Sequence, residues 1–184
     1  MFDNIRSDLA AHDGNWAAQG FWVLVVYRFG RWRYTIRFAP LRKLMSLVFR
    51  ILFKIVWIVT GTEMPCEVVI GRNFVIDHSY GIVIHGQARF GDNCRIRTGV
   101  VVGLNRVNET QAPVFGNNVD IGAGAKILGN IRIGNDVLIG ANAVVLTDVP
   151  DNCIAVGIPA KIKPRNRGAA SMSAAELSVS SEGC

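Results

Sequence analysis

The sequence predicts a mainly β protein, a triangular parallel β-helix that follows a short N-terminal α-helical region. Two observations lead to this prediction. An apolar side chain recurs at every sixth residue through the middle of the chain, and the stretch before it has the apolar and polar spacing of helices. The chain has 184 residues, half of them hydrophobic, which suffices for one domain with a core and a small helical extension.

The six-residue repeat holds its phase over six consecutive positions. These are Phe115, Ile121, Ile127, Ile133, Ile139 and Val145. Two shorter sets keep the same step, namely Phe90, Ile96 and Val102, and before them Ile70, Ile76 and Ile82. A helix repeats its face at 3.6 residues and a strand at two, so neither explains a step of six. In a triangular prism each hexad supplies one short strand and one corner. The hexads from 70 to about 156 would form roughly four to five coils about 4.8 Å apart, in a β-helix domain that spans residues 61–163.

The phase of the repeat breaks twice. From Val102 to Phe115 the step is thirteen residues, one more than two hexads, and the pattern is lost between them. We expect this segment to leave the prism as a loop. The second break, a shift of two residues, falls between Ile82 and Phe90. Irregular backbone on a rigid scaffold is where binding and catalytic residues concentrate.

Residues 1–60 are predicted to be helical, and their charge is one-sided. Between Asp13 and Glu63 there is no acidic residue but there are eight basic ones: Arg28, Arg31, Arg33, Arg37, Arg42, Lys43, Arg50 and Lys54. After Pro40 the polar side chains recur at three and four residues, which predicts an amphipathic helix. Charges near its centre argue against a membrane span. We expect this helix to pack on partner subunits or to lie on an anionic membrane. No nucleic-acid-binding module accompanies the charge, so we expect no nucleic-acid partner.

The cysteines and the N-terminal stretch favour a cytoplasmic protein. Cys66, Cys94, Cys153 and Cys184 are widely spaced without a Cys-x-x-Cys pair, which is typical of neither a zinc site nor a disulfide framework. The polar N-terminal stretch lacks the pattern of a signal peptide. Residues 164–184 are rich in serine and alanine without a period, and we expect a disordered tail.

Three stretches resemble the hexapeptide acyltransferases, and within them the serine O-acetyltransferase branch. They are "IDHSYGIVI" at 76–84, "GAGAKILGN" at 122–130 and "GIPAKI" at 157–162. The resemblance implies a left-handed β-helix that transfers an acetyl group from acetyl-CoA to a hydroxyl, without a metal. It also implies homotrimers, alone or paired as a dimer of trimers, with active sites between neighbouring prisms.

The resemblance also implies roles for individual residues. His78 matches the catalytic histidine, Glu63 matches the carboxylate that orients it, and Asp77 matches an acidic residue that holds the acceptor. Asp13 is a further acceptor-binding candidate, because the family has an aspartate in its helical region. The matches for the acetyl-CoA site are Gly122, Ala123, Gly124, Ala141 and Lys161.

Some candidates depend on the residues alone. Acetyl transfer to an alcohol needs a base for the hydroxyl proton, and histidine has a suitable pKa. We expect a ternary-complex mechanism in which the base activates the acceptor directly. Arg106 lies in the expected loop and is a candidate for contact with the acceptor. His85 is expected to fill a turn, and His12, in the polar N-terminal stretch, is expected to be solvated.

Departures from the serine acetyltransferase pattern decide the expected acceptor. Gln111 and Ala112 stand where that branch has an arginine and a histidine that grip the amino acid, and Cys184 replaces its C-terminal isoleucine. With the short helical region, these features resemble the acetyltransferases of exopolysaccharide clusters, such as those associated with colanic acid. We therefore expect a saccharide acceptor, with contact at the inner membrane. The alternatives are a serine O-acetyltransferase of cysteine biosynthesis, and a non-catalytic β-helix that serves as a scaffold or membrane-surface binding module.

Overall fold

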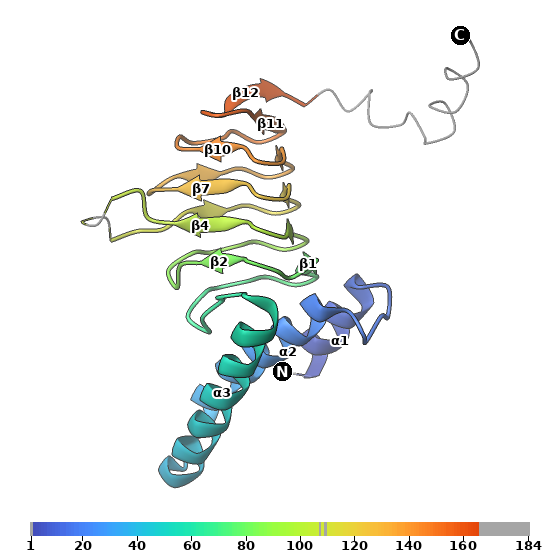
Figure 1. Ribbon diagram of the computed structural model, residues 1–184, viewed down its shortest axis with the longest axis vertical. Helices are drawn as coiled ribbons and strands as arrows, with labels where there is room; N and C mark the ends of the chain where they lie inside the picture. The colour runs from blue at the N-terminus through green and yellow to red at the C-terminus, as the bar shows by residue number, and fades with distance from the viewer. Residues whose placement is uncertain (1, 107, 109, 166–184) are drawn as a thin grey trace.

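In a computed structural model that describes residues 2–106, 108 and 110–165, a three-sided prism stands on a small group of helices (Figure 1). The helices are α1 (Phe2–Ala11), α2 (Gln19–Trp32), the 3₁₀ turn η1 (Arg33–Thr35) and α3 (Ala39–Thr60). Gly61 ends α3 in the left-handed conformation, with φ 62°, and its N–H bonds the carbonyl of Trp57 at 2.8 Å. The chain then enters the prism. Residues 166–184 of the expected tail lie outside the described residues.

The strands of the prism form three columns, one for each face. The six-stranded sheet contains β1 (Val75–Asp77), β3 (Arg95–Arg97), β6 (Asp120–Ile121), β9 (Leu138–Ile139), β11 (Cys153–Val156) and β12 (Lys161–Pro164). The four-stranded sheet contains β2 (Val83–Ile84), β4 (Val101–Gly103), β7 (Lys126–Leu128) and β10 (Val144–Val145), and the two-stranded sheet β5 (Val114–Phe115) and β8 (Arg132–Ile133). All pairs are parallel except β11 with β12. The predicted β-helix is confirmed.

The residues that set the six-residue phase fill the prism. Ile96, Ile121, Ile127 and Ile139 are at most 1 % exposed. Three aromatic rings in contact join them, with Phe74 edge to face on Phe90 at a centroid distance of 5.2 Å and Phe90 stacked on Phe115 at 4.3 Å. The apolar interior is therefore continuous from the helical end to the last coil.

One edge of the prism is a ladder of asparagines, which we call the asparagine edge. Asn73, Asn93 and Asn118 share a left-handed backbone, with φ of 53° to 57°, which asparagine tolerates better than most residues. The Asn73 side-chain amide donates to Asn93 at 2.8 Å, and the Asn93 amide donates to Asn118 at 3.0 Å. These bonds join successive coils on the outside of the prism.

The lengths of the coils show where the chain exceeds its repeat. Val83 pairs with Val101, eighteen residues later, whereas Val75 pairs with Arg95, twenty residues later. The two extra residues therefore lie between Asp77 and Val83. The shift expected between Ile82 and Phe90 is misplaced, because Ile82 and Ile84 are both fully buried and the sequence pattern alone does not tell which one is in phase.

The expected loop is confirmed. The chain leaves the repeat after β4, which ends at Gly103, and returns at β5, which begins at Val114. In Figure 1 the segment between them projects sideways from the prism. The register of the strands on either side is undisturbed, since Val101 pairs with Lys126 and Val114 with Arg132.

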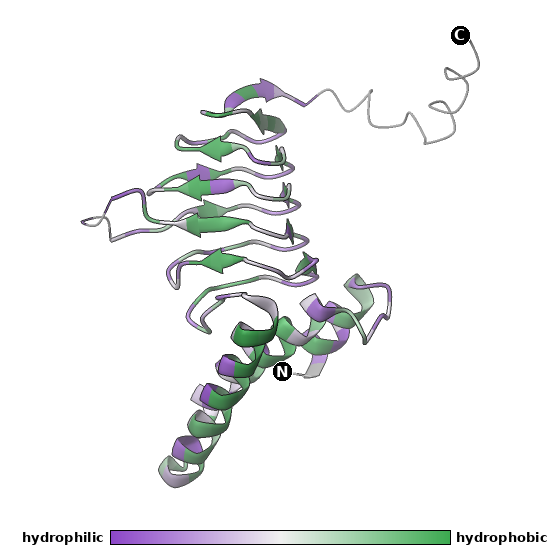
Figure 2. Cartoon of the chain, in the orientation of Figure 1, coloured by the Kyte–Doolittle hydropathy of each residue, from purple (hydrophilic) through white to green (hydrophobic). Residues whose placement is uncertain are grey.

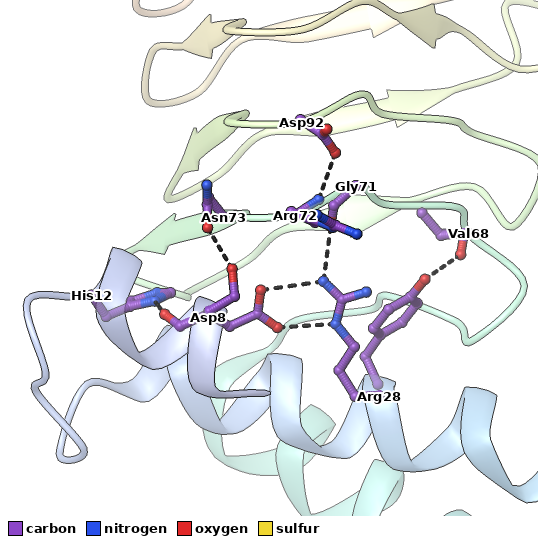
Figure 3. Close-up of polar contacts among 10 residues, drawn as sticks. Asp8, His12, Arg28, Val68, Gly71, Arg72, Asn73 and Asp92 are labelled. Carbon is purple, nitrogen blue, oxygen red and sulfur yellow. Dashed lines mark hydrogen bonds and ion pairs between the residues drawn. The ribbon is translucent and has the colours of Figure 1, made fainter. Parts of the chain in front are cut away.

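A buried ion pair joins the helices to the base of the prism (Figure 3). Arg28 Nε on α2 lies 2.9 Å from Asp8 Oδ2 on α1, and the two side chains are 8 % and 1 % exposed. The Arg28 Nη2 group also donates to the carbonyl of Gly71 at 2.9 Å, while the Tyr27 hydroxyl donates to the carbonyl of Val68 at 2.6 Å. Two helices and the first coil thus share one polar contact.

His12 is buried rather than solvated, which corrects the sequence-based expectation. Its Nδ1 lies 2.7 Å from the carbonyl oxygen of Asp8, and its Nε2 lies 3.3 Å from the backbone nitrogen of Ile76 on β1. This pattern requires a proton on Nδ1 and a free lone pair on Nε2. The imidazole therefore caps an N–H of the prism and fixes the C-terminal end of α1 beside β1.

Helix α3 packs against α2 along one side only. Of its 22 residues, Phe49 and Thr60 are buried, and long apolar side chains are exposed along its outer side. Figure 2 shows this helix as largely hydrophobic and projecting away from the prism. Among the described helices, none is long and apolar enough to cross a bilayer.

We predict that Arg28→Met lowers the free energy of unfolding by about 3–5 kcal/mol, because it leaves the Asp8 carboxylate buried without its cation. Arg50→Met is the matched control, since Arg50 is exposed on α3 and should change stability by less than about 0.5 kcal/mol. Urea unfolding followed by circular dichroism measures both. Equal stability of the two variants would contradict the assignment of the Asp8–Arg28 pair as the contact that holds the helices on the prism, which we call the clamp.

Candidate active site

A second edge of the prism, where the chain turns from the six-stranded to the four-stranded sheet, is built from left-handed corners. Successive corners have positive φ at Gly61, Gly81, Gly99, Gly124 and Asn142. From Gly81 onward, each of these residues donates its N–H to the coil before it, at 2.8 to 3.1 Å. We call this the glycine edge. Glycine is favoured there because it adopts φ near +65° without steric cost.

His78 lies at the Gly81 corner of the glycine edge, where the two extra residues are. Strand β1 ends at Asp77 and the left-handed Gly81 follows four residues later, whereas in the next coil Gly99 follows Arg97 by two. The backbone of His78 is itself left-handed, with φ 54°, and its side chain is exposed. The surplus length of this corner therefore places the imidazole outside the prism wall.

A pocket of about 470 Å³ joins this corner to the helices. Its lining includes Asp77 and His78 from the prism and Asp13 from the turn after α1. Three of the predicted site residues thus share one cavity, although 64 residues separate Asp13 from Asp77. Arg95 and His12 line it too, and neither was singled out as functional from the sequence.

Two arginines face Asp77 from the neighbouring strand β3. Arg95 Nη1 lies 2.8 Å from Asp77 Oδ2, and Arg97 Nε lies 3.8 Å from the same oxygen. Arg97 also bonds Asp120, and this hydrogen bond raises the pKa of the Arg97 guanidinium despite its partial burial. Arg95 is the more exposed of the two and faces the pocket. The pocket therefore contains both negative and positive groups.

Glu63 lies on the adjoining face, one coil below β2. Its N–H donates to the carbonyl of Ile82 at 2.7 Å, and its carbonyl accepts from Ile84 at 2.8 Å. The Glu63 side chain is exposed, and no hydrogen bond in the described part of the chain joins it to His78. The orienting role of Glu63 remains a prediction.

The residues expected to bind acetyl-CoA continue along the glycine edge. Gly122, Ala123 and Gly124 form the corner two coils beyond His78, and Ala141 lies in the corner after that, about 10 Å and 14 Å along the edge. Lys161 begins β12 at the far end, and its side chain is exposed. The glycine edge thus presents a strip of small side chains that begins near His78 and ends near the ammonium of Lys161.

Three further polar residues, Arg106, His85 and Ser79, do not line this pocket. Arg106 is exposed on the loop after β4, so it leaves the prism at another edge and does not meet His78 within one chain. His85 accepts a hydrogen bond from the N–H of Gln87 at 3.4 Å within its own turn. Ser79 Oγ is the one buried side-chain oxygen or nitrogen of the described residues without a partner. Within those residues no group of three or more histidines, cysteines or carboxylates could hold a metal ion.

Gly122→Ala should destabilise the protein by about 1–3 kcal/mol, because a Cβ there would lie 2.5 Å from the backbone nitrogen of Ala141. Gly103→Ala is the control, since its Cβ would find Leu128 Cδ2 at 3.9 Å, an ordinary contact. The midpoints of thermal unfolding measure the difference. A Gly122→Ala protein as stable as Gly103→Ala would show that adjacent corners of the glycine edge are not in close contact.

Comparison with known proteins supplies the family. The description "Bacterial transferase hexapeptide (six repeats)" matches residues 112–147. A serine acetyltransferase of Synechococcus elongatus is 42 % identical over 144 residues, which are 78 % of this chain and 56 % of the relative. One from Helicobacter pylori strain J99 is 38 % identical over 149 residues, 80 % of this chain and 83 % of the relative.

Solved structures give the same result for the fold. Serine acetyltransferase from Brucella abortus strain S19 superposes with a TM-score of 0.77 at 28 % identity, and 90 % of this chain covers 69 % of that one. The soybean apoenzyme has a TM-score of 0.73 at 30 % identity, with 88 % and 68 % covered. A further Brucella structure contains coenzyme A.

These relatives contradict the expected exopolysaccharide acceptor. They are serine acetyltransferases, and the similarity extends through most of this chain rather than through the repeat alone. The expected saccharide acceptor depended on Gln111 and Ala112, on the C-terminal Cys184 and on the short helical region. Of these residues, Ala112 is buried in the core of the prism. This chain spans a little over half the length of the Synechococcus relative and most of the Helicobacter one. The chain belongs to the serine acetyltransferase family.

Proposed function

We propose that this protein is an acetyl-CoA-dependent serine O-acetyltransferase, which transfers the acetyl group to the hydroxyl of L-serine. The observation that supports this most is the corner of His78. It places an exposed imidazole between a charged pocket and a strip of small side chains that continues along the same edge. Relatives named serine acetyltransferase include solved complexes with serine and with coenzyme A.

The donor fits the glycine edge. The small side chains of Gly122, Ala123, Gly124 and Ala141 leave space for an extended pantetheine chain against the backbone. The exposed ammonium of Lys161 at the far end is suited to a phosphate group of the nucleotide. Bound in this direction, acetyl-CoA presents its thioester at the His78 end.

The pocket suits a zwitterionic acceptor. The carboxylates of Asp13 and Asp77 attract the ammonium of serine, and the Arg95 guanidinium attracts its carboxylate. Arg95 Nη1 also lies 2.8 Å from Asp77 Oδ2, so the guanidinium binds Asp77 and the serine carboxylate at the same time. The acceptor therefore binds beside an existing ion pair. A carboxylate and a guanidinium on neighbouring strands thus orient both ends of the amino acid.

His78 acts as the general base. It takes the hydroxyl proton of serine while the hydroxyl oxygen forms a bond to the thioester carbonyl carbon. When the carbon–sulfur bond breaks, the proton passes from the imidazolium to the leaving thiolate, and O-acetylserine and CoA result. Glu63 is proposed to stabilise the imidazolium. A backbone N–H in a corner of the glycine edge is proposed to stabilise the oxyanion.

The same proposal includes assembly and location. The loop that contains Arg106 projects from one edge of the prism, and His78 lies at a different edge, the glycine edge. A homotrimer, alone or in a dimer of trimers, would bring the loop of one subunit beside the glycine edge of the next. We propose a cytoplasmic location, because acetyl-CoA is available there. A cytoplasmic protein can also contact the inner membrane peripherally. Cys66, Cys94 and Cys153 are free and buried, which suits a reducing compartment. Burial raises the pKa of the Cys94 thiol to about 11, which keeps it protonated at neutral pH.

The direct test mixes purified protein, acetyl-CoA and L-serine and measures the free thiol of CoA. Saturable release that depends on L-serine supports the proposal. Slow release that is unchanged by L-serine, from protein that is folded and binds CoA, would show that serine is not the acceptor.

His78→Ala should lower kcat by about 10²- to 10⁴-fold, because general-base catalysis is lost while the pocket remains. His85→Ala is the matched control, because the His85 ring lies in the turn after β2. Its loss should change kcat less than about threefold. Full activity of His78→Ala would refute the base assignment even if L-serine is the substrate.

Arg95→Gln should raise KM for L-serine about 10- to 100-fold, because a charge-assisted hydrogen bond to the carboxylate is lost. KM for ethanolamine, which has the hydroxyl and the ammonium but no carboxylate, should change little. Arg72→Gln, an exposed arginine on the prism, is the control. An equal rise of KM for both acceptors would assign Arg95 to the support of Asp77 rather than to the acceptor.

A further inference from the structure

The outer side of α3 is a continuous apolar stripe. Its residues recur at three and four positions, which places them on one face of a helix. They are Leu41, Leu44, Leu47, Ile51, Ile55 and Ile58, each between 43 % and 67 % exposed. The opposite face, with Phe49, packs against α2. Large connected apolar surfaces on soluble proteins mark sites of interaction.

The stripe continues into a groove between α2 and α3. The groove has a volume of about 290 Å³, and Ile55 belongs to both features. Trp22 and Val26 of α2 and Val59 of α3 also line it, with only Gln19 and Thr60 as polar residues. Trp22 is half exposed at its rim. Tryptophan is enriched where an apolar interior meets a hydrated interface.

Cations flank this surface. Residues 14–62 contain eight basic residues and no acidic one. Arg28 is used in the clamp with Asp8 and Arg33 is buried, which leaves six exposed. The six are Arg31, Arg37, Arg42, Lys43, Arg50 and Lys54. On a helical projection Lys43, Arg50 and Lys54 lie along one border of the apolar stripe.

We propose that this surface, the apolar stripe of α3 with the α2–α3 groove and its bordering cations, binds the face of an anionic lipid bilayer. Charge argues against a contact between two copies of this surface and favours an anionic partner. A second copy of the same surface would bring six cations against six, with no acidic side chain from residues 14–62 to pair with them. Anionic headgroups are complementary, at about 1 kcal/mol for each Lys or Arg near the membrane.

The shape of the molecule allows this contact. Helix α3 projects from the base of the prism, away from the coils that form most of the glycine edge (Figure 1). No described helix can span a bilayer, so α3 lies in the plane of the interface with Leu47 and Ile51 toward the acyl chains. This contact would hold the protein at a membrane whatever its acceptor is.

The test is flotation of the full-length protein with vesicles. We expect it to float with phosphatidylcholine vesicles that contain about one third phosphatidylglycerol and not with pure phosphatidylcholine. Raising the salt from about 50 mM to about 500 mM should reduce binding at least about 10-fold, because the Debye length falls.

Two variants and a control assign the binding to this surface. Replacing Arg42, Lys43, Arg50 and Lys54 together by glutamine should reduce binding at least about 10-fold. The double variant Leu47→Gln, Ile51→Gln should do the same through its apolar part. The control replaces three exposed prism arginines, Arg72, Arg89 and Arg132, by glutamine and should bind like the wild type.

The outcomes separate the proposal from its rivals. Circular dichroism and the mass of the assembly confirm that each variant is folded. Absent flotation of the wild type, or equal loss in the control, would overturn the proposal. If Leu47→Gln, Ile51→Gln dissociates the assembly and the wild type does not bind vesicles, the stripe is a subunit interface. Turnover of soluble L-serine should be unchanged in all variants, so failure of the proposed activity would be seen separately.

Discussion

The structure depends on one constraint: each coil must hydrogen-bond to the coil directly above it. The parallel pairing fixes eighteen residues for a regular coil, as between Val83 and Val101. Residues beyond that number have no partner inside the wall and leave it at a corner. The surplus at Asp77–Val83 and the loop between β4 and β5 are the two longest departures, and they hold His78 and Arg106, respectively. The repeat therefore determines where chemistry can occur.

A second requirement is that the helices meet the prism in a fixed position. The buried pair of Asp8 and Arg28 is not by itself strong evidence of stability, because desolvation offsets much of the attraction between buried charges. Its geometry is specific, however, since the same guanidinium also bonds the carbonyl of Gly71. With His12 bonded to the N–H of Ile76, the clamp determines where Asp13 lies relative to Asp77. The pocket that contains Asp13 and Asp77 is thus a product of packing between distant segments.

Much of this could be predicted from the sequence, because the prism has a local signature. The six-residue step identifies inward residues such as Ile96 and Ile121, and the loss of the step identifies the loop. The grouping of Asp77 and His78 follows from their adjacency. That Gly122, Ala123 and Ala141 share an edge with His78 follows once coils are stacked in register.

What could not be predicted involves partners that are distant in sequence. Arg95 is an ordinary outward strand residue until the twenty-residue coil places it beside Asp77. His12 occurs in a polar segment, and its partner Ile76 N–H is supplied by the first coil. The position of the two extra residues was ambiguous, because Ile82 and Ile84 are both apolar. The exopolysaccharide prediction was wrong because it gave a few local departures, at Gln111 and Ala112, at the C-terminus and in the length of the helical region, more weight than the similarity over most of the chain.

The most direct test of the central claim is hydrogen–deuterium exchange of the full-length protein with and without CoA, analysed by mass spectrometry. If the donor lies along the glycine edge, CoA should slow exchange in peptides that contain the corners at 98–100, 122–125 and 140–143. Peptides confined to the asparagine edge around Asn73, Asn93 and Asn118 should be unaffected. Protection at the asparagine edge without protection at the glycine edge would contradict this placement of the donor and of His78 as its neighbour.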